Sequence, residues 1–299
     1  MKNNLIKNAP LGSESWFRCG GSADALFQPA DLDNLAAFLK QNKEPITILG
    51  GIANTIVRDG GIRGVTIRLG KALSHIEALD ATTLKVEGGV LNGSIAAAAL
   101  KNNIGGLEFL SGIPGTLGGA VTMNAGAYGT EMKDVLVEAH LMDMTGNIHI
   151  KTPDELKMTY RHTNITGDMI VVAAVLKGEP DTYEAVKARL TEIKVKRNGT
   201  QPIKEKTSGS TFANPSAEDL AAAGLPEGTR AWEIVEKIGG RGLMMGGAQI
   251  SEKHCNFMIN ADGATASDLE NLGDELIRRA QEDLGVTLRW EIKRIGERG

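Results

Sequence analysis

The sequence predicts an α+β protein in which helices and strands follow one another irregularly. Helix-like and strand-like segments are mixed along its 299 residues, without the strict alternation that builds a parallel α/β sheet. Hydrophobic residues make up 41% of the chain, enough for a sizeable core. The length favours two domains or three small ones, and we see no internal repeat or low-complexity segment.

The composition argues against several classes of protein. A net charge of -4 is unusual for a general binder of nucleic acids or membrane surfaces. Cys19 and Cys255 are too few for a disulfide framework, which favours a reducing, intracellular setting. The first ten residues lack the apolar core of a signal peptide, and the longest apolar run, 169–176, is too short to cross a bilayer. We expect a cytoplasmic monomer with neither a nucleic-acid nor a membrane partner.

Residues 1–70 read as a first unit of strand, helix and strand. An extended apolar segment comes first, and Asp31 then caps an amphipathic helix that runs to about Asn42. "PITILG" and "GVTIRL" read as strands. Between them lies "LGGIANT", residues 49–55, which we call the glycine turn.

Residues 71–198 read as a second unit. We expect a strand in "TLKVEGG" and an alanine-rich helix that is capped by Asn92 and stops at Gly105–Gly106. "VLVEAHLMD", the turn "MTGN" and "IHIKT" form a predicted hairpin. Residues 169–176 read as a buried strand, and a helix over 181–197 leads out of the unit.

Residues 199–299 read as a third unit of short helices and strands. The helices are expected near 215–223, 231–238 and 267–284, and the strands near 248–250, 257–259 and 287–295. A stretch that runs into the start of this unit, from Lys187 to Lys206, holds seven basic and two acidic residues. This stretch is either a solvated helix face or a positive rim for an anionic ligand.

Several common motifs are absent. "GRGLMM" has methionine where a dinucleotide fingerprint has its third glycine, and "GVTIRLGKA" lacks the Ser or Thr of a phosphate loop. The five histidines have no metal-ligand spacing, and no Gly-x-Ser-x-Gly elbow occurs. We therefore expect no metal site, and the common nucleotide folds and hydrolases fit poorly.

The most informative segment is "GIPGTLGGAVTMNAGAYG", residues 112–129, which we call the glycine stretch. It is rich in glycine and holds no charged residue. Backbone N–H groups of such segments form concave anion sites, and Pro114 suits the first turn of a short helix whose positive end faces a phosphate. Together with the glycine turn, this indicates a pyrophosphate held without lysine or arginine. Neutral hydrogen bonds would come from Asn54, Thr55, Thr116 and Asn124. The alternative is that these glycines serve only tight turns and close packing.

A resemblance now becomes specific. "LGGIANTIVRDGGIRGVTIRL", "GLEFLSGIPGTLGGAVTMNAGAYG", "YRHT", "SGSTFANP", "AQISEKHCNFMIN" and "LRWEIKRIGE" occur in this order over almost the whole chain. In this order they resemble the UDP-N-acetylenolpyruvoylglucosamine reductase (MurB) family, in its shorter type II form. The resemblance implies a two-part FAD-binding domain of the vanillyl-alcohol-oxidase type, here residues 1–70 and 71–198, and a C-terminal substrate-binding domain, residues 199–299.

The resemblance also implies the cofactors and the reaction. NADPH reduces a non-covalent FAD, which passes hydride to the enolpyruvyl double bond and yields UDP-N-acetylmuramate for peptidoglycan synthesis. The implied FAD-binding positions are Gly50, Gly51, Ile52, Ala53, Asn54, Thr55, Gly112, Ile113, Gly115, Thr116, Gly118, Gly119, Ala120, Asn124, Gly126 and Ala127. The chain departs from the family at Ala53, where Ser is usual, and at Ile52, which is often glycine.

Three residues match the catalytic positions of the family. The resemblance makes Ser210 the proton donor to the carbanion, whereas Arg161 and Glu291 stabilise the charge that develops beside the substrate carboxylate. Because an ionised glutamate would repel this charge, we expect Glu291 to be at least partly protonated or hydrogen-bonded to Arg161. Without the resemblance, Arg161 reads as a surface arginine, Ser210 as a helix cap and Glu291 as one charge on a solvated strand face. The implied substrate-binding residues are Tyr160, Lys196, Gln201 and Asn214. We assign His254 to a structural hydrogen-bond network.

Two other functions stay open on the residues alone. An oxidase of alcohols or sugars on the same flavin scaffold would share the glycine segments but would not need Arg161, Ser210 and Glu291 together. A non-catalytic flavin or nucleotide module would leave the basic stretch and the Ser210 loop without a role.

Overall fold

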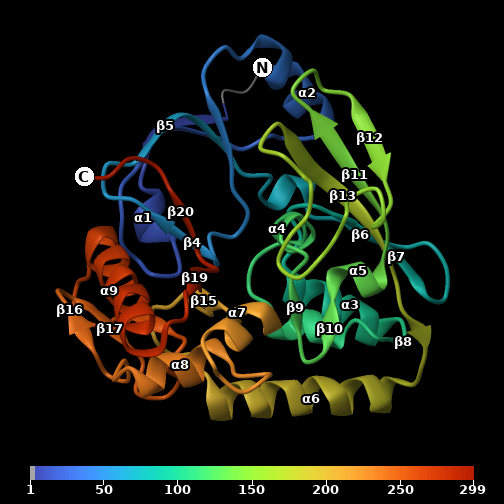
Figure 1. Cartoon of the computed structure of the whole chain (residues 1–299). Coiled ribbons are helices and arrows are strands. Elements are labelled where there is room, and N and C mark those ends of the chain that lie inside the picture. The colour runs from blue at the N-terminus through green and yellow to red at the C-terminus, as the bar shows by residue number, and fades with distance from the viewer. Residues whose placement is uncertain (1–3) are drawn as a thin grey trace. The chain divides into compact units, whose positions relative to one another are not determined.

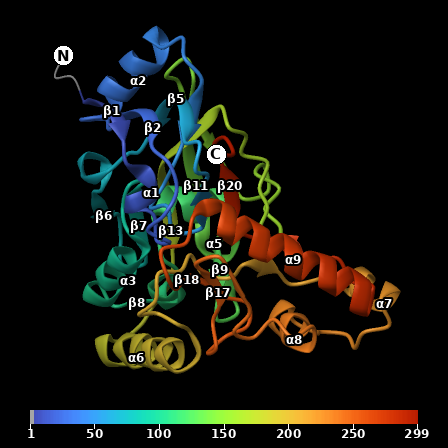
Figure 2. The same ribbon diagram turned by 90° about the vertical axis from the view of Figure 1, so that its left-hand side faces the viewer.

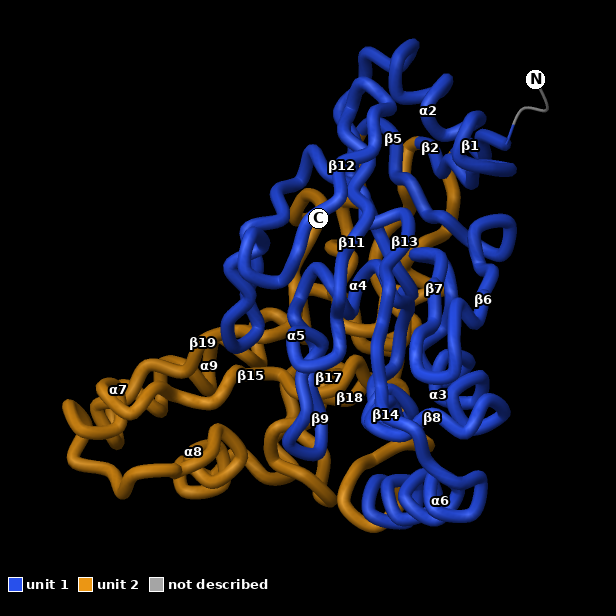
Figure 3. Tube along the Cα trace, turned by 90° about the vertical axis from the view of Figure 1, so that its right-hand side faces the viewer, with its two compact units in different colours: residues 1–7, 25–51, 64–197 blue, residues 8–24, 52–63, 198–299 orange. Residues whose placement is uncertain are grey.

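The computed structural model describes residues 4–299 and divides them into two compact units. Unit 1 holds residues 4–7, 25–51 and 64–197, and unit 2 holds residues 8–24, 52–63 and 198–299, coloured blue and orange in Figure 3. Each unit is thus built from separate parts of the chain. Our domain boundaries at residues 70 and 198 stay a prediction. No helix within residues 4–299 is long and apolar enough to cross a membrane.

The first sheet has four strands in the order β1-β2-β5-β3, and α2 belongs to the same part of the fold. The bounds are β1 Leu5–Ala9, β2 Ala23–Phe27, α2 Leu32–Gln41, β3 Ile46–Ile48 and β5 Ile62–Ile67. The unit boundaries fall inside β1, β2 and β5. As predicted, Asp31 caps α2, because its carboxylate accepts a hydrogen bond from Asn34 N at 2.7 Å.

The second sheet of unit 1 is the larger one, with five strands in the order β12-β11-β13-β7-β6 (Figure 1). Its bounds are β6 Ile76–Ala78, β7 Thr83–Glu87, β11 Leu136–Asp143, β12 Ile148–Lys151 and β13 Met169–Lys177. β11 and β12 form the predicted hairpin, with Ala139 opposite Lys151. β13 is the predicted buried strand, since it lies at the centre of the sheet and residues 170–176 are all buried.

Short elements and helices complete unit 1 around the glycine stretch. They are η1 Lys71–Leu73, α3 Asn92–Lys101, β8 Ile104–Gly105, η2 Glu108–Gly112, α4 Leu117–Thr122, β9 Gly126–Ala127, β10 Thr130–Glu131, α5 Met132–Val135, β14 Glu179–Pro180 and α6 Tyr183–Thr200. Arg189 joins α6 to η2 through the buried carboxylate of Glu108, with Nη2 and Oε1 2.6 Å apart. This ion pair fixes the helix that carries Lys196.

Unit 2 is built around α9, the long red helix of Figure 2. Its elements are α1 Leu11–Glu14, β4 Thr55–Val57, β15 Phe212–Ala213, α7 Ala217–Ala222, α8 Ala231–Lys237, β16 Met244–Met245, β17 Ala248–Ile250, β18 Met258–Asn260, α9 Ala266–Leu284, β19 Arg289–Trp290 and β20 Lys293–Ile295. Three small sheets join them, in the orders β16-β17-β18, β15-β19 and β20-β4. The apolar face of α9, with Leu269, Leu272 and Leu276 fully buried, holds the core together.

The final strand places the chain differently from our prediction. We expected one strand over 287–295, but the ladder is interrupted at Glu291 and Ile292. β19 pairs antiparallel with β15, whereas β20 pairs parallel with β4. One continuous strand cannot change both its partner and its direction of pairing, so the chain bends between β19 and β20. At the bend, the backbone amides of Glu291 and Ile292 both donate to Thr211 O.

The expected cap of α3 is also wrong. The N-cap is Leu91, and Asn92 is the first helical residue, because Leu91 forms a β-bridge with Thr116 and Asn92 N donates to Gly115 O at 3.1 Å. The carboxamide oxygen of Asn92 is buried without a hydrogen-bond partner among residues 4–299. The helix ends at Lys101, and Gly105 lies in β8.

Candidate active site

The glycine turn and the glycine stretch are in direct backbone contact within unit 1. A Cβ atom placed on Gly51 would lie 2.9 Å from Gly115 Cα, and one on Gly50 would lie 2.7 Å from Thr116 Oγ1. Real Cβ atoms essentially never approach within 3.0 Å of another heavy atom. Gly51 therefore needs glycine, because it meets backbone, whereas a side chain at Gly50 would have to displace the Thr116 hydroxyl. Two segments about sixty residues apart thus pack backbone against backbone.

The start of α4 is tied down more firmly than the sequence predicts. Leu117 N donates to Val90 O at 2.8 Å, and Gly118 N donates to Gly88 O at 2.9 Å. We expected these amides to face a phosphate, but two of the donors at this helix start are already used. Pro114 is also not the first helical residue, since it lies two positions before the N-cap, Thr116. The bonds instead fix the glycine stretch against the loop that follows β7.

The second half of the glycine turn belongs to unit 2 and runs beside Glu291. Ile52 has φ +49°, and its carbonyl accepts a hydrogen bond from Trp16 N at 3.3 Å. Asn54 Nδ2 donates to Glu291 O at 3.2 Å, and Asn54 O accepts from Lys293 N at 3.0 Å. The Asn54 amide, expected to face a phosphate, thus holds the main chain of a predicted catalytic residue.

Arg161 lies against the glycine stretch through three hydrogen bonds that join residues 122–126 to residues 159–163. Arg161 Nη2 donates to Gly126 O at 2.9 Å, Asn124 Nδ2 to Thr159 O at 2.9 Å, and Thr163 Oγ1 to Thr122 O at 2.8 Å. Asn124 is fully buried, and its oxygen accepts a hydrogen bond from Lys133 N at 3.0 Å. Its side chain therefore connects the glycine stretch to the Arg161 loop and to α5, a role that sequence reasoning missed.

Tyr160 and Lys196 each make an aromatic contact in unit 1. The Arg161 guanidinium lies over the Tyr160 ring, 5.0 Å from its centroid. The Lys196 ammonium lies 5.6 Å from the ring centroid of Tyr128, a residue that sequence reasoning did not single out. Burial raises the pKa of the Tyr128 phenol, and the nearby charge of Arg197 partly opposes this shift.

Ser210 and Glu291 come close together in unit 2. Ser210 forms a β-bridge with Phe257, and the next residue, Thr211, accepts a hydrogen bond from Glu291 N at 2.9 Å. Gly209 has φ +83°, so the tight glycine that we expected before Ser210 is present. Ser210 is not a helix cap, because α7 is capped by Ser216, whose hydroxyl accepts from Asp219 N at 3.1 Å.

The remaining predicted residues of unit 2 occupy separate places. Asn214 Oδ1 accepts a hydrogen bond from Ala231 N at 3.1 Å. Gln201 lines a pocket of about 650 Å³ together with Lys204, Ser251 and Lys253. His254 Nδ1 accepts from Asn256 N at 3.2 Å, as expected for a structural role, and burial lowers its pKa.

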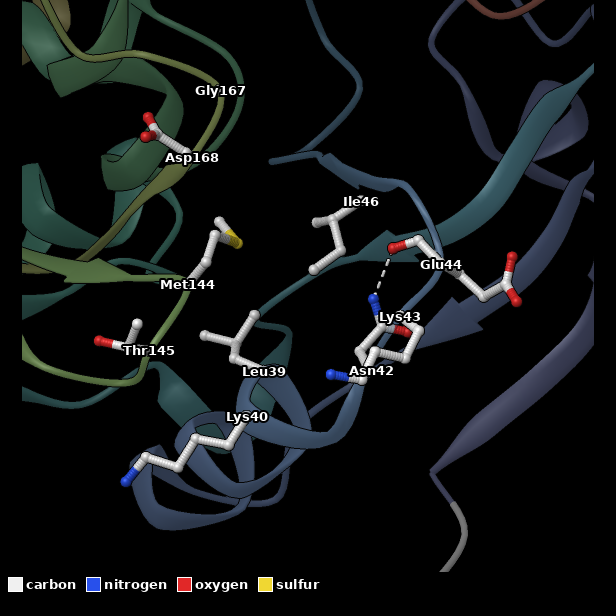
Figure 4. A pocket seen from close by; sticks show the side chains of 10 residues that line it. All are labelled: Leu39, Lys40, Asn42, Lys43, Glu44, Ile46, Met144, Thr145, Gly167 and Asp168. Atoms are coloured by element: carbon white, nitrogen blue, oxygen red, sulfur yellow. Dashed lines mark hydrogen bonds between the residues drawn. The ribbon is translucent and has the colours of Figure 1, made fainter.

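A further pocket, of about 600 Å³, lies in unit 1 at the end of α2 (Figure 4). Leu39, Ile46 and Met144 form its apolar part, and Lys40 and Asp168 are among its charged residues. None of the predicted site residues lines it, so we do not assign it to the active site. No group of three or more His, Cys, Asp or Glu residues that could hold a metal ion occurs within residues 4–299.

Comparisons with known proteins match the whole chain. Residues 23–151 match the model of an FAD binding domain, and residues 201–295 match the C-terminal domain of UDP-N-acetylenolpyruvoylglucosamine reductase. A UDP-N-acetylenolpyruvoylglucosamine reductase from Maricaulis maris is 46% identical over 298 residues, which cover 99% of this chain and 93% of the relative. One from Rickettsia bellii is 47% identical, covering 99% and 95%.

The chain belongs to the UDP-N-acetylenolpyruvoylglucosamine reductase family. The crystal structure of the MurB enzyme from Thermus caldophilus agrees, with a TM-score of 0.80 and 30% identity over 98% of both chains. Membership confirms the predicted α+β architecture of an FAD-binding domain followed by a substrate domain. The protein is therefore an FAD-dependent oxidoreductase.

The geometry of the two glycine segments fits the FAD that membership in the MurB family implies. Gly50 and Gly51 leave no side chain between the glycine turn and the glycine stretch, so a cofactor can approach the backbone of both. Such close approach of backbone to ligand is a usual reason for glycine. Since neither segment carries a charged side chain, the cofactor's phosphates would be bound by neutral donors.

Gly51→Ala should abolish most of the flavin binding in this MurB protein. The added methyl group meets the backbone of Gly115, which cannot move aside as a flexible side chain would. We expect the ratio of flavin absorbance to protein absorbance after gel filtration to fall to a small fraction of the parent's value.

Gly93→Ala is the matched control, because nothing lies within 4 Å of a Cβ at Gly93 and alanine favours the helix α3. Its flavin content should equal the parent's. Full flavin retention by Gly51→Ala would show that the contact between the two glycine segments does not shape the FAD site.

Proposed function

We propose that the protein reduces the enolpyruvyl group of UDP-N-acetylenolpyruvoylglucosamine to give UDP-N-acetylmuramate, with NADPH as the electron donor, in the cytoplasmic synthesis of peptidoglycan precursors. The observation that supports this most is the hydrogen bond from Arg161 to Gly126, which places a permanent positive charge on the glycine stretch. An oxidase of neutral alcohols has no use for this charge. A substrate with a carboxylate beside its reacting carbon does.

When bound and reduced by NADPH, FAD would supply hydride to the terminal carbon of the enolpyruvyl group. Negative charge then develops on the neighbouring carbon and spreads into the carboxylate. Arg161 stabilises this charge, because its guanidinium is always protonated and binds a carboxylate through two parallel N–H groups. Its bond to Gly126 O and its contact with Tyr160 orient the side chain before substrate arrives.

Ser210 delivers the proton to the neighbouring carbon. The C–H bond formed at that carbon completes the reduction. The structure supports this role because Ser210 caps no helix and its main chain is fixed by Gly209 and by the bridge to Phe257. A serine whose main chain is held in this way has fewer conformations to search when its hydroxyl acts as a general acid.

Glu291 lies beside the substrate carboxylate and helps Arg161 to stabilise the charge that develops there. Two hydrogen bonds hold its main chain, from its own amide to Thr211 O and from Asn54 Nδ2 to its carbonyl. Its position in the interrupted strand therefore couples the Ser210 loop to the glycine turn.

The substrate is bound by Tyr160, Lys196, Gln201 and Asn214. Lys196 supplies a positive charge for the pyrophosphate. FAD is bound without a covalent bond by residues 50–55 and 112–127, since neither segment contains the histidine or cysteine that such a bond would need.

The proposed function predicts a defined product. Purified protein, mixed anaerobically with NADPH and UDP-N-acetylenolpyruvoylglucosamine, should give UDP-N-acetylmuramate and NADP⁺ in equal amounts by mass spectrometry and absorbance. An alcohol or sugar, added to the oxidised protein without NADPH, should leave the flavin oxidised. Flavin reduction by a sugar, with no product from the enolpyruvyl compound, would support an oxidase instead.

Ser210→Ala should separate the two halves of the reaction. Its flavin should be reduced by NADPH at nearly the parent's rate, because no proton is delivered to the substrate in that half. Reoxidation by the enolpyruvyl substrate should slow by about 10² to 10⁴, the usual effect of general acid catalysis. Stopped-flow absorbance of the flavin follows both halves.

Ser216→Ala is the control, because it removes a true helix cap and should cost about 1 kcal/mol of stability without slowing either half. Ser210→Cys should restore part of the rate, since a thiol also donates a proton. If Ser210→Ala is reoxidised as fast as the parent, the acid lies elsewhere.

A further inference from the structure

Tyr128 occupies a position in the backbone that does not favour an aromatic residue. Tyr128 and Gly129 form the two-residue loop between β9 and β10, with φ +55° and +88°. Positive φ at both positions is the pattern of a type I′ turn, in which Asn, Asp or Gly is preferred at the first position. A bulky residue in this region is strained, and such strain persists where the side chain has a use.

The Tyr128 ring lies between the glycine stretch and α6. A Cβ on Gly112 would lie 2.4 Å from Tyr128 Cε2, so the ring fills the space that a side chain at residue 112 would take. The Lys196 ammonium lies 5.6 Å from the ring centroid, within the range of a cation–π interaction. The residue is 37% exposed, which leaves part of it open to solvent.

We propose that Tyr128 is a positioning residue that holds the Lys196 ammonium beside the glycine stretch for the pyrophosphate of the nucleotide substrate. Lysine carries its charge on a flexible four-carbon stem, and fixing that stem costs conformational entropy on binding. A ring face held by the Tyr128 turn and by Gly112 restricts the ammonium while leaving its N–H groups able to donate to phosphate oxygens. This inference rests on the role of Lys196 in the proposed function.

The same helix contains a matched aromatic pair. The Lys187 ammonium also lies 5.6 Å from a ring centroid, that of Tyr183, and both residues lie on α6. Neither residue belongs to the proposed site. The pair therefore serves as a control, a cation–π contact of equal length outside the proposed site.

The deciding variant is Tyr128→Asn in the FAD-loaded protein. Asparagine suits the type I′ turn, so the variant should be at least as stable as the parent by thermal unfolding and should retain its flavin. Its affinity for UDP, measured by calorimetry, should nevertheless fall about 3- to 10-fold, the effect of losing one partly exposed cation–π contact. The KM for the enolpyruvyl substrate should rise by the same factor, with kcat little changed.

Two variants check that the ring itself is responsible. Tyr128→Phe keeps the ring and should bind UDP within about twofold of the parent. Tyr183→Leu removes the matched contact on α6 and should leave UDP affinity unchanged. Equal weakening by Tyr183→Leu would overturn the proposal, because the effect would then belong to α6 as a whole.

Lys196→Met separates this inference from the proposed function. If Tyr128 acts through Lys196, Lys196→Met weakens UDP binding, and adding Tyr128→Asn to it causes no further loss. Normal UDP binding by Tyr128→Asn alongside weakened binding by Lys196→Met overturns the inference and leaves the proposed function standing. Normal binding by Lys196→Met instead removes Lys196 from the substrate site, and the inference falls with that assignment.

Discussion

The backbone contact between Gly51 and Gly115 is the constraint on which the flavin-binding part of the structure depends. It brings together two segments that are distant in sequence, and it leaves no room for a side chain at Gly51. The neighbouring bonds, from Leu117 N to Val90 O and from Gly118 N to Gly88 O, fix the glycine stretch against the loop that follows β7. In this way an uncharged surface of backbone becomes rigid enough to orient a cofactor.

The same glycine stretch also holds Arg161 and Tyr128 in place. Its residues 122–126 hold the loop of Arg161 through three hydrogen bonds, and its last turn presents Tyr128 to Lys196. In unit 2, Asn54 connects the glycine turn to the main chain of Glu291. Segments expected only to bind phosphate therefore also hold the groups that we propose act on the substrate. Pre-organisation of this kind lowers the cost of orienting charge during the reaction.

Local patterns in the sequence predicted much of the fold. The β11–β12 hairpin, the central strand β13 and the Asp31 cap each follow from residues close together in the chain, and each is confirmed. Errors arose where partners distant in sequence decide the structure. Thr211 interrupts the last strand at Glu291, and the bridge from Leu91 to Thr116 moves the start of α3.

The family motifs identified the candidate site residues, but they did not show how the chain holds them. Asn124 and Asn54 looked like phosphate ligands because neutral amides near glycines commonly are. Their bonds to Thr159 and Glu291 depend on contacts that no local pattern contains. For Ser210 the structure removed one alternative, since the cap of α7 is Ser216.

The measurement that tests this account most directly compares the two half-reactions of Arg161→Met, with the exposed Arg278→Met as control. The account predicts that the variant binds FAD and is reduced by NADPH within about twofold of the parent. Reduction of the enolpyruvyl substrate should lose about 2–4 kcal/mol of transition-state stabilisation, or roughly 30- to 1,000-fold in rate. An unchanged rate of enolpyruvyl reduction would contradict the account, because the charge held on the glycine stretch would then have no part in catalysis.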